Sequence, residues 1–261
     1  MMQNVWSWKA NVRKARVFIL LFGSSLLIAC ASSSQPVSPV LQDARAQVVE
    51  LQHSSTNNMQ LVQNLRDILV SFADVGYLWK ADLLLANQYM VHGLQQQARA
   101  SLQDCIHLNQ STELLEGQQS CQLLLYRLTE QAELLQQIID NPASERLQAL
   151  AYAYQGEFDK AQALLKHIPK DHYADLAYLN FQLGWHYKQT QYLHDALKYY
   201  RLAADKRGIV DTLFALAKVY HIKKEQGKSK HYSLLALRSA KINFPQLAIK
   251  IQNWQAQRAS S

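Results

Sequence analysis

The residues Leu183–Ala204, LGWHYKQTQYLHDALKYYRLAA, place small and large side chains at regular helical intervals. The small residues are Gly184, Ala196 and Ala203, and the large ones are Tyr187 and Tyr200. Two helices can cross closely only where Gly or Ala on one helix faces a bulky side chain on the other. The stretch therefore predicts two antiparallel helices joined by a short turn.

The same pattern recurs around three other tyrosines. Tyr152, Tyr187 and Tyr220 follow one another at intervals of 35 and 33 residues, and Tyr89 precedes Tyr152 by 63 residues, close to two intervals. A degenerate unit over 121–139 fills the gap. Because one such helix pair cannot bury its apolar face alone, neighbouring pairs are expected to stack.

A helix-turn-helix pattern with a period of about 34 residues resembles the tetratricopeptide repeat (TPR) family. The resemblance covers 79–243, and residues 196–220 also resemble the related Sel-one-like repeats, without their glycine-rich insertion. It implies an α-solenoid of antiparallel helix pairs, a TPR-like superhelix. Apolar residues at helical spacing predict N-terminal helices over 41–78, and Pro245 opens a predicted capping helix over 244–257. Alternating β-branched runs are few, so we predict an all-α fold.

The N-terminal segment has the features of an export signal. Basic residues precede an apolar run of about 12 residues, which is too short to span a bilayer as a helix of about 20 residues. The run ends in Leu27-Ile28-Ala29-Cys30, which resembles the lipobox of bacterial lipoproteins. The resemblance implies a signal peptide over 1–29, lipidation of Cys30 and a short flexible tether over 30–40. An ordinary signal peptide with a chance cysteine is the alternative. Because Ala31 rather than Asp follows the cysteine, the resemblance implies an outer-membrane lipoprotein facing the periplasm.

Charge is divided unevenly along the chain after this signal. Residues 30–187 contain 9 Lys or Arg and 16 Asp or Glu, whereas residues 188–261 contain 14 and 4. The basic half either meets an anionic partner or is a solvated helical surface. Candidate partners are lipid headgroups, lipopolysaccharide, an acidic protein or the acidic half of a second copy. Despite the basic charge we expect no nucleic-acid partner, because an exported protein lies outside the cytoplasm, where nucleic acid is located.

Motifs for catalysis and cofactor binding are missing from the sequence. It contains no nucleophile elbow G-x-S-x-G, no zincin motif H-E-x-x-H, no P-loop and no dinucleotide-binding G-x-G-x-x-G. His221 and His231 lie ten residues apart around a lysine-rich segment, which favours a solvated basic turn over a metal site. We therefore predict a protein without cofactor, metal or enzymatic activity.

Two further cysteines follow Cys30. In the repeat frame, Cys105 falls late in the second helix of one unit and Cys121 in the first helix of the next, and these helices are packing neighbours. The compartment of an exported protein is oxidising, so a disulfide between them is one expectation. Two buried thiols that pack like alanine are the alternative.

The tetratricopeptide resemblance also implies a concave groove lined by the first helix of each unit. The side chains that it places in this groove are Tyr154, Tyr178, Phe181, Trp185, Lys188, Phe214 and Lys218, with Arg146 and Leu150 beside them. Aromatic rings with lysines at their edge are a composition typical of peptide-binding sites. The alternative is that these rings pack under the next helix as core.

These features favour a scaffold over an enzyme. The predicted function is a non-enzymatic outer-membrane lipoprotein that acts as an adaptor for assembly of an envelope machine, holding an envelope protein or peptide in the groove. In length and plan the chain resembles the pilotin-type lipoproteins of type IV pilus secretins. The alternatives are an adaptor for peptidoglycan hydrolases or polysaccharide export, and a structural lipoprotein that forms homo-oligomers through its acidic and basic halves.

Overall fold

The computed structural model describes residues 37–52 and 58–259. The predicted signal peptide, the lipidation site Cys30 and most of the predicted tether lie outside these residues. The chain divides into two compact units between Gln42 and Asp43. Of the first unit, the structure describes residues 37–42. All the sites discussed below belong to the second unit.

The described residues form thirteen α-helices and no strand, which confirms the all-α prediction for this part of the chain. The helices are α2 (Pro39–Gln52), α3 (Met59–Ser71), α4 (Val75–Val91), α5 (Gln95–Ser111), α6 (Leu115–Thr129), α7 (Ala132–Asp140), α8 (Glu145–Gln155), α9 (Phe158–Leu165), α10 (Tyr173–Tyr187), α11 (Thr190–Leu202), α12 (Lys206–Ile222), α13 (Gln226–Asn243) and α14 (Pro245–Ala259). Helix α4 crosses the predicted boundary between residues 78 and 79, and α14 occupies the place of the predicted capping helix.

Polar side chains define where several of these helices begin. Asn58, Ser144 and Asp205 each precede a helix and accept a hydrogen bond from a backbone N–H of its first turn. Such N-caps satisfy donors that have no partner inside the helix. Helix α8 ends at Gly156, whose φ of 82° is the left-handed conformation that glycine adopts at little cost. Short capped turns of this kind reverse the chain between consecutive helices.

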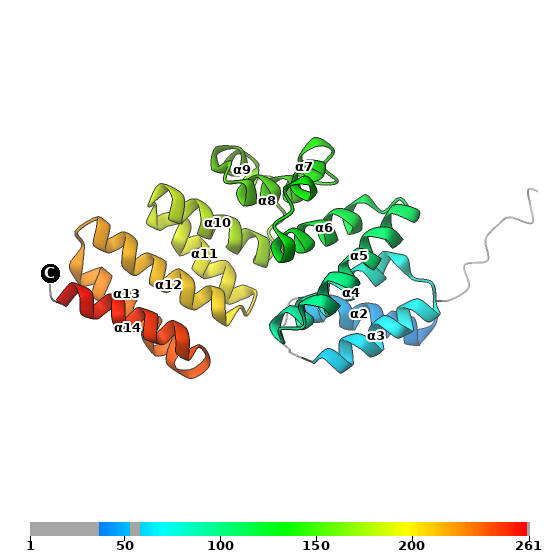
Figure 1. The fold of residues 1–261 in the computed structure, drawn as a ribbon, viewed down its shortest axis with the longest axis horizontal. Coiled ribbons are helices and arrows are strands. Elements are labelled where there is room, and N and C mark those ends of the chain that lie inside the picture. The colour runs from blue at the N-terminus through cyan, green and yellow to red at the C-terminus, as the bar shows by residue number, and fades with distance from the viewer. Residues whose placement is uncertain (1–36, 53–57, 260–261) are drawn as a thin grey trace, which may run out of the picture. The chain divides into compact units, whose positions relative to one another are not determined.

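From α3 onward, each helix packs against the next one in the chain (Figure 1). A second set of contacts joins alternate helices: α4 contacts α6, α6 contacts α8, α8 contacts α10, and α10 contacts α12. The even-numbered helices from α4 to α12 therefore form a continuous series. This series carries the groove described in the next subsection.

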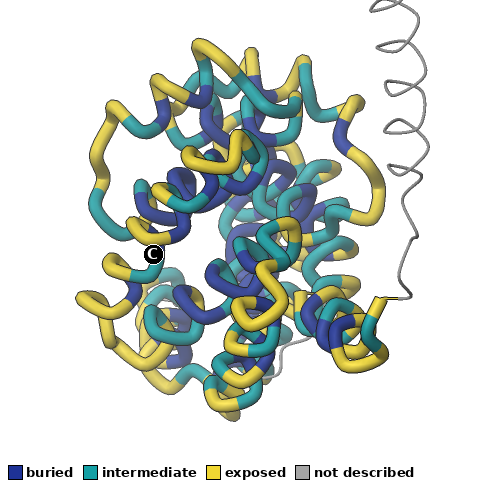
Figure 2. Tube along the Cα trace, turned by 90° about the vertical axis from the view of Figure 1, so that its right-hand side faces the viewer, coloured by how far each residue is buried: buried dark blue, intermediate teal, exposed yellow. Residues whose placement is uncertain are grey.

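Apolar clusters follow one another along the chain. One lies among α4, α5 and α6 around Leu102, another spans α6 to α10 around Leu147 and Leu179, and another spans α11 to α14 around Leu216 and Ile251. Figure 2 shows the buried residues where helices face one another and the exposed ones mainly on turns and outer faces. Each cluster is built by a few consecutive helices, so the core extends with the chain.

Gly184, a small residue of the repeat pattern, and Gly208, which the pattern did not include, permit close contacts between helices. A Cβ atom on Gly184 would lie 2.9 Å from the backbone nitrogen of Leu193, and one on Gly208 would lie 2.3 Å from Cδ1 of Tyr200. Tyr200 therefore fills the space that Gly208 leaves open. Ala196, the third small residue in this region, is fully buried. The packing accounts for Gly184, Ala196 and Tyr200 of the predicted pattern, whereas Tyr187 and Ala203 are only partly buried.

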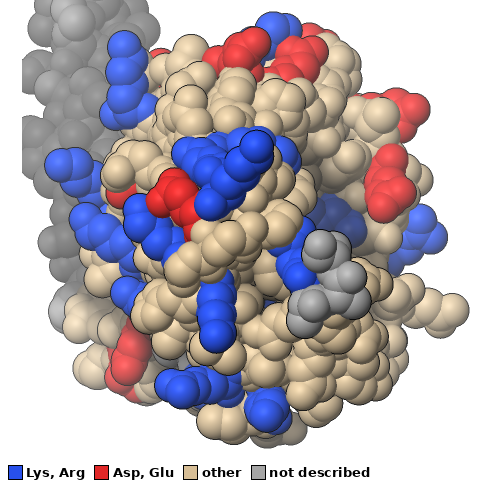
Figure 3. Space-filling view, turned by 90° about the vertical axis from the view of Figure 1, so that its left-hand side faces the viewer, with Lys and Arg blue, Asp and Glu red and all other residues tan. Residues whose placement is uncertain are grey.

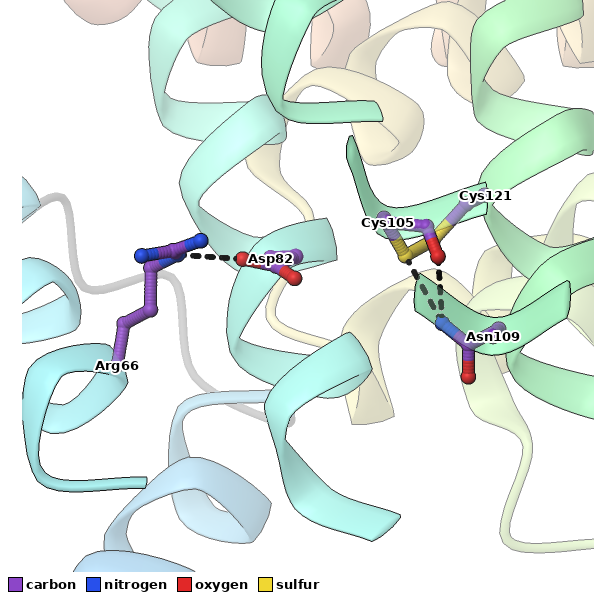
Figure 4. The surroundings of a disulfide bond; sticks show 5 residues. All are labelled: Arg66, Asp82, Cys105, Asn109 and Cys121. Atoms are coloured by element: carbon purple, nitrogen blue, oxygen red, sulfur yellow. Dashed lines mark hydrogen bonds and ion pairs between the residues drawn. A yellow bond between two sulfur atoms is a disulfide. The ribbon is translucent and has the colours of Figure 1, made fainter. Parts of the chain in front are cut away.

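A disulfide joins Cys105 of α5 to Cys121 of α6 (Figure 4). Both cysteines are fully buried, and the side-chain amide of Asn109 donates a hydrogen bond to the Cys105 carbonyl at 2.7 Å. Nearby, Arg66 of α3 donates to the buried carboxylate of Asp82 in α4 at 2.6 Å. Burial raises the pKa of Asp82, and Arg66 opposes that effect. An ion pair therefore links α3 to α4, and a disulfide links α5 to α6.

The burial of His194 predicts that the stability of the protein depends on pH. Burial lowers the pKa of this half-buried imidazole below its ordinary 6.5, and its Nε2 lies 3.1 Å from the Tyr220 hydroxyl. As pH falls below about 6.5, the unfolded chain binds the proton before the folded one, so the free energy of unfolding should decrease. His194→Gln should remove this contribution, and urea unfolding of both proteins between about pH 8 and pH 5 measures it. An identical pH dependence in the two proteins would contradict the expectation; His92→Gln, at an exposed position, is the control.

Candidate partner-binding groove

Helices α4, α6, α8 and α10 provide most of the wall of a groove of about 720 Å³. This volume lies in the range of about 300–1,000 Å³ that is usual for binding sites. Its apolar wall includes Trp79, Leu124 and Leu150, and its polar wall includes Arg127 and Asp171. Except for Asp171, which lies in the turn before α10, these side chains come from helices of the even-numbered series, so the contacts within that series position most of the groove.

A row of tyrosines crosses three of these helices. The rings of Tyr126 in α6 and Tyr154 in α8 meet edge to face with centroids 5.5 Å apart, and Tyr154 stacks on Tyr178 of α10 at 4.7 Å. Burial raises the pKa of both Tyr154 and Tyr178, so their hydroxyls stay protonated. Aromatic pairs of this kind add about 0.5–1.5 kcal/mol beyond the area that they bury. Tyr154 and Tyr178 of this row line the groove and give it a half-buried aromatic wall with neutral hydroxyls.

Arg146 of α8 links the helices on either side of it. Its guanidinium donates to Glu116 of α6 at 2.5 Å and to Asp175 of α10 at 2.6 Å, with 13% of its side chain exposed. Burial disfavours the charged guanidinium, but the carboxylates of Asp175 and Glu116 outweigh that effect and raise the pKa of Arg146. All three residues line the groove. Arg146 therefore holds α6, α8 and α10 together beneath the site.

Replacing Arg146 with methionine should destabilise the protein by about 2–4 kcal/mol, since it leaves two carboxylates without their shared partner. The control is Arg207→Met. Arg207 is exposed and pairs at 2.8 Å with Asp211 on its own helix. Its substitution should therefore lower the free energy of unfolding by less than about 1 kcal/mol. Chemical unfolding measures both effects. Equal losses would show that the bridge across three helices contributes no more than a surface pair.

The side chains predicted for the groove lie in two places. Tyr154 and Tyr178 line the groove, as does Arg146. Phe214 is 5% exposed and belongs to the apolar cluster of α11 to α14, against which Phe181 also packs. Trp185 is 36% exposed and lies two helical turns beyond Tyr178 on α10. The predicted aromatic side chains therefore do not form one continuous surface. Phe214 instead follows the alternative, in which the ring packs under the next helix as core.

The two predicted lysines accompany Trp185. The Lys188 Nζ lies 3.9 Å from the centroid of the Trp185 ring, and the Lys218 Nζ lies 5.7 Å from it and 4.2 Å from the Phe214 centroid. These residues form a second surface, on α10 and α12, which is considered separately below.

Sequence reasoning missed several residues of the groove. Trp79, Glu116 and Arg127 line it but belong to α4 and α6, where the repeat pattern is weak or degenerate. Ser120 on α6 also lines it, and its buried Oγ has no hydrogen-bond partner among the described residues. Glu116 lies just before the degenerate unit over 121–139, and no spacing rule in the sequence selects it.

The described residues contain no group of three or more His, Cys, Asp or Glu side chains able to hold a metal ion. None of the helices in residues 37–52 and 58–259 is both long and apolar enough to cross a membrane.

No protein-family model matches the chain. A comparison with curated proteins finds no significantly similar sequence.

Proposed function

We propose that this protein is a non-enzymatic adaptor that holds a protein partner in the groove between α4 and α10. In this proposal, lipidation of Cys30 anchors it to the outer membrane, facing the periplasm, and the partner belongs to an envelope machine of the type IV pilus or secretin kind. The observation that carries the proposal is the groove itself, in which Tyr154 stacks on Tyr178 and Arg146 pairs with carboxylates of the neighbouring helices.

The packing of the helices supports a TPR-like solenoid. In an α-solenoid every pair packs on the next, and one helix of each pair forms the inner surface. The contacts between consecutive helices, together with those between α4, α6, α8, α10 and α12, agree with this plan. The inner surface of the proposed solenoid is the one that carries the groove.

The chemistry of the groove favours binding over catalysis. The guanidinium of Arg146 is held by two carboxylates, and Tyr154 and Tyr178 stay protonated because burial raises the pKa of each. Half-buried rings, such as those of Trp79, Tyr154 and Tyr178, suit an extended or helical peptide. Aromatic and arginine side chains are also those that most often dominate the energy of protein interfaces.

Photo-crosslinking in intact bacterial cells tests this function. A photoreactive amino acid is placed at Asn87 or Ala174, which are exposed and line the groove, in the full chain with its signal. The controls are Arg99 on α5 and Ala163 on α9, which are exposed and are not part of the groove wall. We expect both groove positions to capture one envelope protein that neither control captures.

The identity of that protein decides between the pilus or secretin machine and the other envelope systems. Capture of the same proteins at groove and control positions would contradict the adaptor function of the groove. Capture only of a second copy of the chain would favour a structural oligomer.

A further inference from the structure

A second surface, which we call the cationic aromatic surface, lies on α10, α12 and α14. Its residues are Trp185, Lys188, Lys218, Lys250, Trp254 and Arg258. Lys188 and Lys218 approach the Trp185 ring, and the guanidinium carbon of Arg258 lies 3.9 Å from the centroid of Trp254. The Phe214 ring, which Lys218 also contacts, meets the Trp254 ring edge to face at 5.4 Å. Aromatic rings therefore connect the cations of three helices.

Lys218 lies in an environment that disfavours its charge. Burial, together with the charges of Lys250 and Arg258, lowers its pKa, against the opposing effect of Asp211. The Asp211 carboxylate accepts a hydrogen bond from Arg207 at 2.8 Å, and no ion pair among the described residues includes Lys218. A half-buried ammonium surrounded by cations is costly to maintain. A carboxylate supplied by a partner would relieve this cost.

The helices that carry this surface contain few acidic residues. Residues 206–259 contain 11 Lys or Arg and 2 Asp or Glu, and both acidic residues already form ion pairs, Asp211 with Arg207 and Glu225 with Lys228. Figure 3 shows Lys and Arg side chains spread over the end of the molecule that these helices form. A surface of this kind attracts an anionic partner over distances of about a Debye length, roughly 8 Å at physiological salt.

We infer that the cationic aromatic surface binds an acidic segment of another protein, with carboxylates at Lys188 and Lys218 and an apolar side chain against Trp185. This contact is separate from the groove and does not depend on what the groove binds.

The placement of the ammonium groups favours a peptide over a lipid surface. The Lys188 Nζ donates a hydrogen bond to the Trp185 carbonyl at 2.6 Å and lies on the face of the indole ring. Lys218 is half-buried between two rings. Such groups are held against the protein, whereas lysines that bind a membrane extend toward the headgroups. A narrow chain of carboxylates can reach them.

The sequence also favours a different protein over a second copy. Although residues 30–187 are acidic, no two acidic residues are adjacent anywhere in the chain. Several of the acidic side chains that could be offered, such as Glu116, Asp175 and Asp82, are engaged by arginines of their own chain. The chain therefore lacks a dense acidic segment of its own.

Binding of synthetic peptides to the full chain in nonionic detergent tests this inference. The probe is a fluorescent 12-residue peptide of Asp and Glu with a central Leu-Leu, and the matched peptide carries Asn and Gln instead. Fluorescence anisotropy at low salt measures the dissociation constants. Lys218→Met keeps the apolar stem and removes the charge; Lys230→Met, at an exposed position of α13, makes the same change in net charge elsewhere.

We expect only the acidic peptide to bind, with Lys218→Met weakening it about tenfold and Lys230→Met less than about twofold. Because the folded environment disfavours the Lys218 charge, Lys218→Met should melt at the same or a higher temperature, which a purely structural lysine would not do.

Three results would overturn the inference: equal weakening by the two variants, no binding of the acidic peptide, or self-association that Lys218→Met abolishes. The first would indicate diffuse attraction and the last a second copy as partner. If the peptide fails to bind while micelles containing phosphatidylglycerol, but not phosphatidylcholine, change the tryptophan emission, the surface serves a lipid instead.

Discussion

Gly184→Ala is expected to destabilise the protein by about 3 kcal/mol, at the upper end of the range of about 1–3 kcal/mol that is typical of substitutions that overpack a core. The new Cβ would lie 2.9 Å from the Leu193 backbone nitrogen and 2.8 Å from its Cγ. A flexible side-chain tip could move aside, but a backbone atom at the start of α11 moves only if α10 and α11 separate. The gain in helix propensity, about 1 kcal/mol, is too small to offset this. Urea unfolding and the melting temperature measure the loss.

The control is the same substitution at Gly227, near the start of α13. A Cβ there meets nothing within 4 Å, so Gly227→Ala should leave stability unchanged or raise it by up to about 1 kcal/mol. If Gly184→Ala were as stable as Gly227→Ala, α10 and α11 would have to be able to move apart freely. In that case the small residue of the repeat pattern would not be a packing requirement.

The second large loss of stability is expected when the disulfide between Cys105 and Cys121 is reduced. Cys105 and Cys121 are 16 residues apart, and closing a loop of that size restricts the unfolded chain. The chain-entropy account assigns about 3 kcal/mol to such a link. We therefore expect a reducing agent to lower the free energy of unfolding of the protein by about this amount.

The double substitution Cys105→Ala with Cys121→Ala separates this effect from any other action of the reductant. The variant should be less stable than the oxidised protein and insensitive to reductant. Retention of full stability on reduction, with both thiols shown to be free, would contradict the expectation. It would mean that packing of α5 against α6 alone determines the stability of this region.

The fold class and the close contacts were predictable because they depend on local pattern. Gly184, Ala196 and Tyr200 recur at repeat spacing since a helix pair can approach only at such positions, and the structure places each in a close contact or in the core. In α4 and α6 the same helices form with weaker patterns. Groove residues such as Trp79 and Glu116 were therefore not identifiable, because packing constrains them less than it constrains glycines.

The division of the predicted aromatic set shows a limit of carrying the groove positions of tetratricopeptide repeats onto this sequence. Tyr178, Trp185 and Phe214 were placed on one surface because their positions in the repeat are similar. However, which side of a helix is covered depends on neighbours far along the chain. Helix α14 supplies Trp254, which packs edge to face on Phe214, whereas Tyr154 of α8 stacks on Tyr178. These partners are 40 and 24 residues away, beyond any local rule.

The helices pack mainly on their near neighbours in the chain, and this affects how easily the groove and the cationic aromatic surface are lost by local unfolding. Contacts between nearby elements close short loops, so each helix pair can form and open with little dependence on distant ones. Terminal pairs of such arrays usually exchange their amide protons sooner than central ones. The groove lies among central helices, whereas Trp254 and Arg258 belong to α14, the last of the described helices, which packs on α13. Brief detachment of α14 would therefore dismantle the cationic aromatic surface and leave the groove intact.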